Sequence, residues 1–121
     1  MKVLIVDDDQ FIRSVFTAQF TQENIFAITA VDGEEGFTKA VEELPDVIIL
    51  DLILPKQDGF ELLEKLHKHP KLTGVKRVVF SGLGQEHDKQ EALAAGADAF
   101  FSKDGDTIGR VVDWVRALSS K

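Results

Sequence analysis

Several short apolar runs in this chain end at a residue whose side chain could bind a cation or a phosphoryl group. The residues at these ends are Asp7 with Asp8, Asp51, Ser81 and Lys103. If the runs are parallel strands of one sheet, their carboxyl ends meet at one edge, where open α/β folds bind their ligands. The sequence therefore predicts a pocket for a divalent cation and a phosphoryl group.

The carboxylates of Asp7, Asp8 and Asp51 would lie close together in such a pocket. Like charges in contact raise the pKa of at least one carboxyl group, whereas a bound divalent cation keeps all of them ionised. A ligand set made only of oxygen atoms suits Mg²⁺, or Mn²⁺, rather than zinc. We therefore expect these aspartates to form a magnesium site.

Asp51 is the best candidate for a nucleophile in this pocket. It ends a run predicted to be a central strand, and a carboxylate can accept a phosphoryl group to form an acyl phosphate. The Lys103 ammonium and the Ser81 hydroxyl would each stabilise a phosphoryl oxygen. Catalysis would then consist mostly of positioning and electrostatic stabilisation.

The elements that must position these groups are five runs with strand character, at 3–6, 25–31, 47–50, 78–80 and 97–101. The first, third and fourth runs are unbroken apolar stretches, as expected for parallel strands covered on both faces. The second run contains Thr29, and the fifth is short and rich in small residues. We therefore expect the second and fifth strands at the edges of the sheet.

Helical patterns alternate with these runs. Apolar residues recur at helical spacing within 12–20, 37–44, 62–66 and 108–118, the second pattern ending at Leu44. The third pattern opens after Asp58-Gly59, and a further helix around Ala92 and Leu93 should stop at a left-handed Gly96. Repeated strand-helix units predict an α/β fold with a doubly wound parallel sheet.

Composition narrows the functional class. The 121 residues are predicted to form a single domain, 1–121, because no linker, repeat or low-complexity segment divides them. The absence of cysteine excludes a disulfide framework and thiolate chemistry. The first residues do not resemble a signal peptide and no run approaches the roughly 20 apolar residues that span a bilayer, so a cytoplasmic protein is expected. A net charge of −7 should repel nucleic acid and anionic membranes.

Four segments carry a resemblance to a known family: VDDDQFIR near the start, DLILPKQDG in the middle, SG after the fourth run and SK after the fifth. By their order and spacing, the whole chain resembles the receiver domain of two-component response regulators, the chemotaxis regulator family. The resemblance implies a flavodoxin-like (βα)5 fold with strand order 2-1-3-4-5.

The same resemblance implies roles for individual residues. Asp51 would be the phosphoacceptor. The implied metal ligands are Asp7, Asp8, Asp51 and the backbone carbonyl of Ile53. The implied switch residues are Ser81, Phe100 and Lys103. Asp9 is an extra aspartate by motif position, and we expect it to cap the first helix.

The resemblance also implies partners. A histidine kinase or a phosphotransfer protein would supply the phosphoryl group from a phosphohistidine. An unknown downstream protein would bind the surface formed by the fourth helix, the fifth strand and the fifth helix. No direct contact with nucleic acid or a membrane is expected. The domain would catalyse its own phosphotransfer and autodephosphorylation without being an enzyme in the usual sense.

Two functions of other classes agree with part of the sequence. A Mg²⁺-dependent phosphohydrolase with an aspartyl-phosphate intermediate would use the spacing of Asp7 and Asp9, but no insertion is long enough for a substrate-covering cap segment. A receiver-like interaction module that is never phosphorylated would be expected to lack part of the set, and none is missing. The chain could also be a piece of a longer regulator with an output domain.

The sequence departs from the family pattern after the fifth strand. Asp104 follows Lys103 where many receivers have proline, and its carboxylate is expected to cap the last helix. Ile53 and Leu83 are apolar groups on the route by which water would attack an acyl phosphate, so hydrolysis should be slow. No ligand spacing connects the histidines, which are expected on the surface: His67, His69 and His87.

Overall fold

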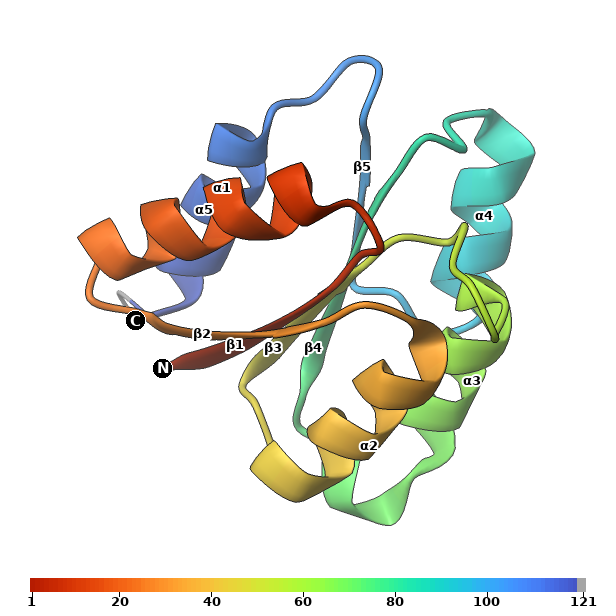
Figure 1. Ribbon diagram of the computed structural model, residues 1–121. Coiled ribbons are helices and arrows are strands. Elements are labelled where there is room, and N and C mark those ends of the chain that lie inside the picture. Colours follow the sequence, from red (N-terminus) through yellow and green to blue (C-terminus); the bar gives the residue numbers. More distant parts are fainter. Residues whose placement is uncertain (120–121) are drawn as a thin grey trace.

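The computed structural model describes residues 1–119, which form a parallel sheet with helices on both faces (Figure 1). The strands are hydrogen-bonded in the order β2-β1-β3-β4-β5, which confirms the doubly wound fold and the predicted order 2-1-3-4-5. The elements are β1 (Lys2–Val6), α1 (Gln10–Gln22), β2 (Phe26–Ala30), α2 (Gly33–Glu43), β3 (Val47–Leu50), α3 (Gly59–Lys68), a 3-10 turn (Pro70–Leu72), β4 (Lys76–Ser81), α4 (Glu86–Ala94), β5 (Ala99–Ser102) and α5 (Ile108–Ser119).

Two hydrophobic cores lie on opposite faces of the sheet, because successive side chains of a strand point to opposite faces. α1 and α5 cover one core, in which Phe16 and Val115 are fully buried. α2, α3 and α4 cover the other, in which Leu62 and Leu66 are buried (Figure 1). The apolar runs within β1, β3 and β4 supply both cores at once. These strands are central and β2 and β5 are the edges, as predicted.

The strand bounds differ in detail from those predicted. β4 begins at Lys76 and includes Ser81 as its last residue, whereas the prediction placed Ser81 after the strand. β5 begins only at Ala99, because the N–H of Ala97 bonds to the carbonyl of Ala92 at the end of α4. Ser81 is therefore held by strand pairing, opposite Ser102 of β5.

Short polar side chains and one glycine set the helix ends. Asp9 caps α1 by accepting the backbone N–H of Phe11 at 2.9 Å, as predicted. Asp58 caps α3 by accepting the N–H of Phe60. Gly96 follows α4 with φ +115°, and a Cβ there would lie 2.9 Å from the Cβ of His67. The predicted glycine stop after α4 is therefore confirmed.

Two leucines were wrongly assigned to apolar helix faces. Leu44 is the left-handed C-cap of α2, with φ 48°, and is 52% exposed because the helix ends at Glu43. Leu93 lies on α4 but is 41% exposed. The buried residues of α4 are Asp88 and Ala92, so this helix contributes little to the core.

The cap predicted for the last helix is also wrong. Thr107, not Asp104, precedes α5, and its hydroxyl accepts the backbone N–H of Arg110 at 3.2 Å. Asp104 lies too far before the first residue of α5 to cap that helix. Its backbone N–H donates to the Ser102 hydroxyl. No helix among residues 1–119 is long and apolar enough to cross a membrane.

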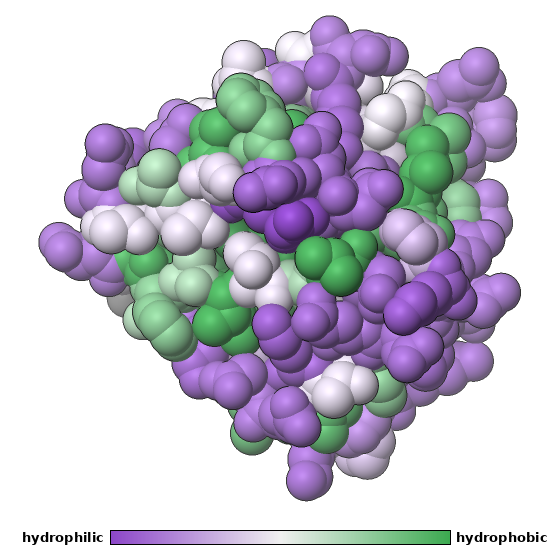
Figure 2. All heavy atoms as spheres, in the orientation of Figure 1, coloured by the Kyte–Doolittle hydropathy of each residue, from purple (hydrophilic) through white to green (hydrophobic). Residues whose placement is uncertain are grey.

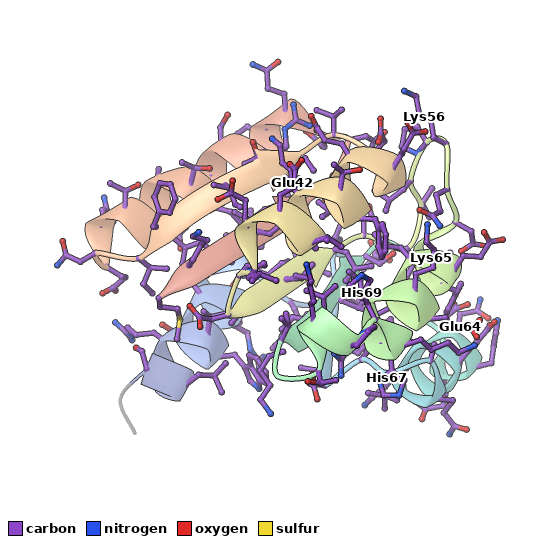
Figure 3. The ribbon with its side chains drawn as sticks, turned by 90° about the horizontal axis from the view of Figure 1, so that it is seen from below. Glu42, Lys56, Glu64, Lys65, His67 and His69 are labelled. Carbon is purple, nitrogen blue, oxygen red and sulfur yellow. The ribbon has the colours of Figure 1, made fainter. Side chains whose placement is uncertain are left out.

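Two of the three histidines are exposed, as predicted, and the third is half-buried. His67 is exposed in the last turn of α3, and His69 is half-buried directly after that helix (Figure 3). His87 is exposed in the first turn of α4. His69 accepts the backbone N–H of Lys71 at Nδ1, a structural contact that begins the 3-10 turn.

Candidate functional site

Two aspartates lie side by side where the central strands β1 and β3 end. Val6 and Leu50 are paired in register, so Asp7 and Asp51, the residues that follow them, become neighbours. The backbone N–H of Asp51 donates to the Val6 carbonyl at 3.1 Å. Both aspartates are buried, with exposed fractions of 3% and 5%. The strand pairing therefore fixes two carboxylates at the carboxyl edge of the sheet.

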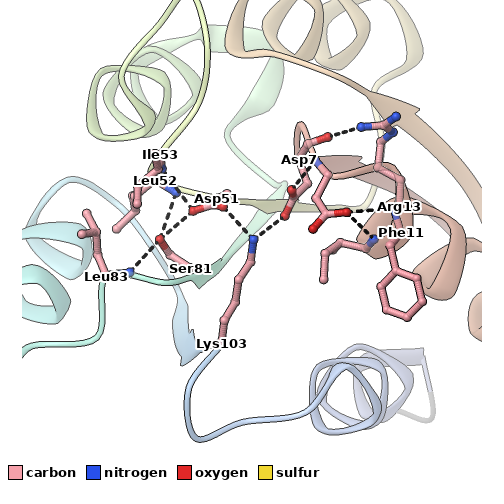
Figure 4. Close-up of polar contacts among 11 residues, drawn as sticks. Asp7, Phe11, Arg13, Asp51, Leu52, Ile53, Ser81, Leu83 and Lys103 are labelled. Carbon is pink, nitrogen blue, oxygen red and sulfur yellow. Dashed lines mark hydrogen bonds and ion pairs between the residues drawn. The ribbon is translucent and has the colours of Figure 1, made fainter.

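Lys103 follows the edge strand β5, and its side chain contacts both of these carboxylates. It is the first residue after β5, and its backbone N–H bonds to the Ser81 carbonyl at 2.8 Å. Its Nζ atom lies 2.7 Å from Oδ2 of Asp51 and 3.0 Å from Oδ2 of Asp7 (Figure 4). The predicted convergence of residues from β1, β3 and β5 is therefore present in the structure.

Ser81 orients the other oxygen of Asp51. The fully buried Ser81 hydroxyl donates to Oδ1 of Asp51 at 2.6 Å and accepts backbone N–H groups from Leu83 and Leu52, at 3.2 Å and 3.4 Å (Figure 4). The same Oδ1 accepts the backbone N–H of Ile53 at 3.1 Å. Both oxygens of the Asp51 carboxylate are thus held in place.

Burial and ion pairing shift the pKa values of Asp7 and Lys103. Burial raises the pKa of Asp7 above its usual value, although the N–H of Asp9 and the ammonium of Lys103 oppose that shift. Burial acts to lower the pKa of Lys103, but its hydrogen bonds to Asp51 and Asp7 outweigh this and raise that pKa. Lys103 therefore remains a cation, while the charge on Asp7 is costly without a further positive partner.

A divalent cation would supply that partner. Asp7, Asp8 and Asp51 offer oxygen atoms that all lie within 4.8 Å of one another, and they are the one such group of three among residues 1–119. Asp8 is exposed, so the group opens to solvent. Three carboxylates against one lysine leave a net negative charge, and an all-oxygen set of this kind fits Mg²⁺ or Mn²⁺.

The remaining predicted residues lie around the cluster. Ile53 directs its side chain to solvent, 57% exposed, while its N–H contacts Asp51. Phe100 lies opposite Val79 on the edge strand β5 and is half-buried against the core under α2, α3 and α4. Phe100 thus adjoins the core and the weakly buried helix α4 rather than the ion pairs.

One supporting residue was not predicted. The Arg13 guanidinium donates to the backbone carbonyl of Asp7 at 2.7 Å (Figure 4), and Oδ1 of Asp7 accepts the N–H of Asp9 at 2.9 Å. These bonds hold the loop that carries the aspartates against α1. The position of Arg13, one turn after the capping Asp9, is the only signal in the sequence.

The sequence is similar to a known protein family over most of its length. Residues 3–112 match the model of the response regulator receiver domain. The chain is 34% identical over 117 residues to the DNA-binding dual master transcriptional regulator RpaA of Synechocystis, covering 97% of this chain and 48% of that protein. It spans 39% to 48% of the length of three curated transcriptional regulators that it matches.

Solved structures give the same result. The receiver domain of Francisella response regulator 1452 superposes with a TM-score of 0.87 at 28% identity, covering 99% of this chain and 98% of that chain. A CheX-CheY-BeF3-Mg²⁺ complex from Borrelia burgdorferi gives a TM-score of 0.88 at 31% identity, covering 100% of this chain and 90% of that one. Both neighbours thus extend over nearly the full length of the chain.

Proposed function

The chain belongs to the response regulator receiver domain family of two-component signalling, and we propose that Asp51 accepts a phosphoryl group from a partner protein. One observation carries the proposal: the Asp51 carboxylate contacts Lys103 at one oxygen and Ser81 at the other, beside a second buried carboxylate, Asp7. In that arrangement the Asp51 carboxylate is the nucleophile. The Lys103 ammonium and the Ser81 hydroxyl lie where they could stabilise the phosphoryl oxygens.

In the transfer step, an Asp51 carboxylate oxygen attacks phosphorus and the phosphorus-nitrogen bond of a phosphohistidine breaks. The electron pair of that bond stays on the imidazole nitrogen, which then takes up a proton. Lys103 and Ser81 are both within hydrogen-bond distance of Asp51. They are placed to stabilise the negative charge that develops on the phosphoryl oxygens during the transfer. The donor is proposed to be a histidine kinase or a phosphotransfer protein.

The proposed cofactor is Mg²⁺, with Mn²⁺ as a substitute. Asp7, Asp8 and Asp51 would hold it, together with the backbone carbonyl of Ile53. When bound, the ion neutralises negative charge on the carboxylates and on a phosphoryl oxygen. In the same region, the side chains of Ile53 and Leu83 are apolar and are unable to orient a water molecule, so we expect a long-lived phosphoaspartate that is lost by slow autodephosphorylation.

The proposed output is binding of a downstream protein at the surface of α4, β5 and α5, controlled by Ser81, Phe100 and Lys103. RpaA is named as a DNA-binding regulator, and this chain covers only 48% of it. A DNA-binding function would therefore reside in a segment outside the receiver domain. The net charge of −7 argues against direct contact of this domain with nucleic acid.

The phosphoacceptor assignment is tested by incubating the protein with acetyl phosphate and Mg²⁺, followed by phosphate-affinity electrophoresis. The wild type and the control Asp9→Asn should both shift, because asparagine keeps the helix cap. Asp51→Asn should not shift. Labelling of Asp51→Asn at the wild-type rate, mapped to Asp7 or Asp8 by mass spectrometry, would show that the acceptor is misassigned.

A further inference from the structure

The edge strand β2 has an uncharged sequence. Residues 24–31 read NIFAITAV and contain no lysine, no proline and no charged residue, the devices that usually prevent two edge strands from pairing. Phe26 is 60% exposed and Val31 is 45% exposed. β2 is an edge strand of the sheet (Figure 1). In the same view, Figure 2 shows weakly polar and apolar atoms along β2, with hydrophilic atoms on either side.

Alternate residues of β2 direct their backbone groups away from the sheet. Phe26 donates its N–H to the Met1 carbonyl, and the Ala30 carbonyl accepts the N–H of Asp7, so the even-numbered residues face β1. The odd-numbered residues, Ile25 to Val31, therefore face outward.

Some of these outward groups are already bonded within the domain. The N–H of Ile25 bonds to the Phe20 carbonyl at 2.9 Å, and the Thr29 carbonyl accepts Nζ of Lys39 at 2.5 Å. Four outward groups between residues 25 and 29 remain without a partner among residues 1–119: the Ile25 carbonyl, the N–H and carbonyl of Ala27, and the N–H of Thr29.

These free groups are self-complementary about a two-fold axis. We propose that β2 pairs antiparallel with β2 of a second copy of the chain, with Ala27 opposite Ala27. The two Ala27 residues exchange N–H to carbonyl bonds, and each Thr29 N–H donates to the Ile25 carbonyl of the other copy. In a regular ladder this register would also pair the Ile25 N–H with the Thr29 carbonyl of the other copy, but both groups are already bonded inside each domain, so the contact consists of four bonds and leaves no unpaired group between residues 25 and 29.

The side chains agree with the same register. Pairing Ala27 with Ala27 places the exposed Phe26 opposite the half-buried Ile28 of the second copy, an aromatic residue against a β-branched one. The strand carries no charged side chain, and the Lys39 ammonium that lies on the Thr29 carbonyl of each copy would be roughly 14 Å from its counterpart, so two copies of a chain with net charge −7 approach here with little local repulsion. The contact uses none of the residues of the phosphoacceptor pocket, so it does not depend on the proposed function.

Sedimentation tests the contact, since a single short strand pair predicts weak association that is visible only at high concentration. From 10 µM to about 1 mM, the average mass of the wild type should rise from 13.4 kDa toward twice that value. Phe26→Lys, which places two lysines diagonally across the axis, should weaken association at least about tenfold. Phe11→Lys is the matched control, since Phe11 is 70% exposed but lies on α1, and it should behave as the wild type.

A wild type that stays at 13.4 kDa at about 1 mM would overturn the proposal. Association that Phe26→Lys leaves unchanged, or that Phe11→Lys abolishes, would place any interface elsewhere. Association should persist in Asp51→Asn, which separates a failure of this proposal from a failure of the phosphoacceptor assignment.

Disulfide trapping tests the register, because the chain has no cysteine of its own. Ala27→Cys places one thiol on each side of the axis, with Cα atoms about 5.5 Å apart, within the range of a disulfide. Thr29→Cys is the control, since the two Thr29 residues would be separated by roughly 14 Å. Oxidation should give a covalent dimer of Ala27→Cys and leave Thr29→Cys monomeric. Equal trapping of both variants, or trapping of Thr29→Cys alone, would contradict this register.

Discussion

At the scale of single residues, the site is a balance between three carboxylates and one ammonium. Lys103 approaches both buried aspartates within 3.0 Å, whereas the exposed Asp8 forms no ion pair with any residue of 1–119. We expect this imbalance to make the stability of the protein depend on a bound divalent cation. Replacements that remove one carboxylate at a time can therefore separate metal binding from ion pairing.

Asp8→Ala should weaken Mg²⁺ binding more than Asp9→Ala. Asp8 belongs to the group of three oxygen donors, whereas the Asp9 carboxylate is engaged at the N-terminus of α1 by the N–H groups of Phe11 and Ile12. We expect a loss of about tenfold or more for Asp8→Ala and a small change for Asp9→Ala. Calorimetric titration of the three proteins measures this, and equal losses for both variants would contradict the ligand assignment.

Asp7→Asn should stabilise the metal-free protein at neutral pH. Because burial raises the pKa of Asp7 in the folded state, ionising it costs stability above the usual value of 3.8, and the cost disappears as the pH falls below that value. The variant should therefore melt higher than the wild type at pH 7 without metal, and the difference should vanish near pH 3.

Added Mg²⁺ supplies the control for that experiment. At a concentration 100 times its Kd, the ion should stabilise the wild type by about 2.7 kcal/mol and Asp7→Asn by much less. Thermal melts with EDTA or with Mg²⁺ measure both effects. A variant that is less stable than the wild type under metal-free conditions at pH 7 would show that the Lys103 contact outweighs burial.

At the scale of elements, α4 is weakly anchored in the core, and we expect it to move at less cost than α3. Its buried residues are Asp88 and Ala92, whereas α3 buries Leu62, Leu63 and Leu66. Phe100 on β5 and Leu83 before α4 pack only partly against the same core. We therefore expect a change at Ser81 to reach α4 and β5 without disrupting the centre of the molecule.

Beryllofluoride, which mimics the phosphoryl group on aspartate, should shift the NMR signals of 84–93 and Phe100 as well as those of the pocket. The mimic is expected to draw the Ser81 hydroxyl away from Asp51 Oδ1, which makes room for Phe100 to rotate inward. A change from 1% to 99% active requires about 5.5 kcal/mol, and a smaller preference gives a graded switch.

Two variants make this measurement decisive. Ser81→Ala should reduce the shifts near Phe100 while beryllofluoride still binds Asp51, and Ser14→Ala, on the exposed surface of α1, should leave them unchanged. Shifts confined to the pocket in the wild type would mean that α4 and β5 do not transmit the signal.

At the scale of the whole molecule, one sheet supports two cores. Ile5 belongs to the core under α1 and α5, and Leu66 belongs to the core under α2, α3 and α4. Because β1, β3 and β4 contribute to both, neither core can be lost while the other remains intact. A single cooperative unfolding transition is expected for a domain of this size.

Ile5→Val and Leu66→Ala should both shift that single transition in urea. We expect losses of about 0.5–1.5 and 2–5 kcal/mol, because both side chains are almost completely buried. The two residues lie on opposite faces of the sheet, so the double variant should show the sum of the losses within about 0.5 kcal/mol. Two separate transitions, or strong coupling between the sites, would contradict this account.

The sequence by itself determined the fold class and the chemical character of the site. Unbroken apolar runs mark β1, β3 and β4 as buried on both faces, and that local pattern requires a parallel sheet covered by helices. Polar residues at strand ends must then gather at one edge, so the cluster of Asp7, Asp51 and Lys103 followed from topology. The cap at Asp9 is equally local and was also predicted correctly.

The tertiary structure decided what depends on contacts between elements. Lys103 and Asp7 are 96 residues apart, and their distance is set by the packing of strands rather than by any local pattern. Two further contacts depend on where loops end. One is the hydrogen bond from Arg13 to the Asp7 carbonyl, and the other is the cap of α5 at Thr107 rather than at Asp104. The free backbone groups of β2 appear only once Phe20 and Lys39 have bonded to some of their neighbours, because hydrogen-bond satisfaction is a property of the assembled sheet.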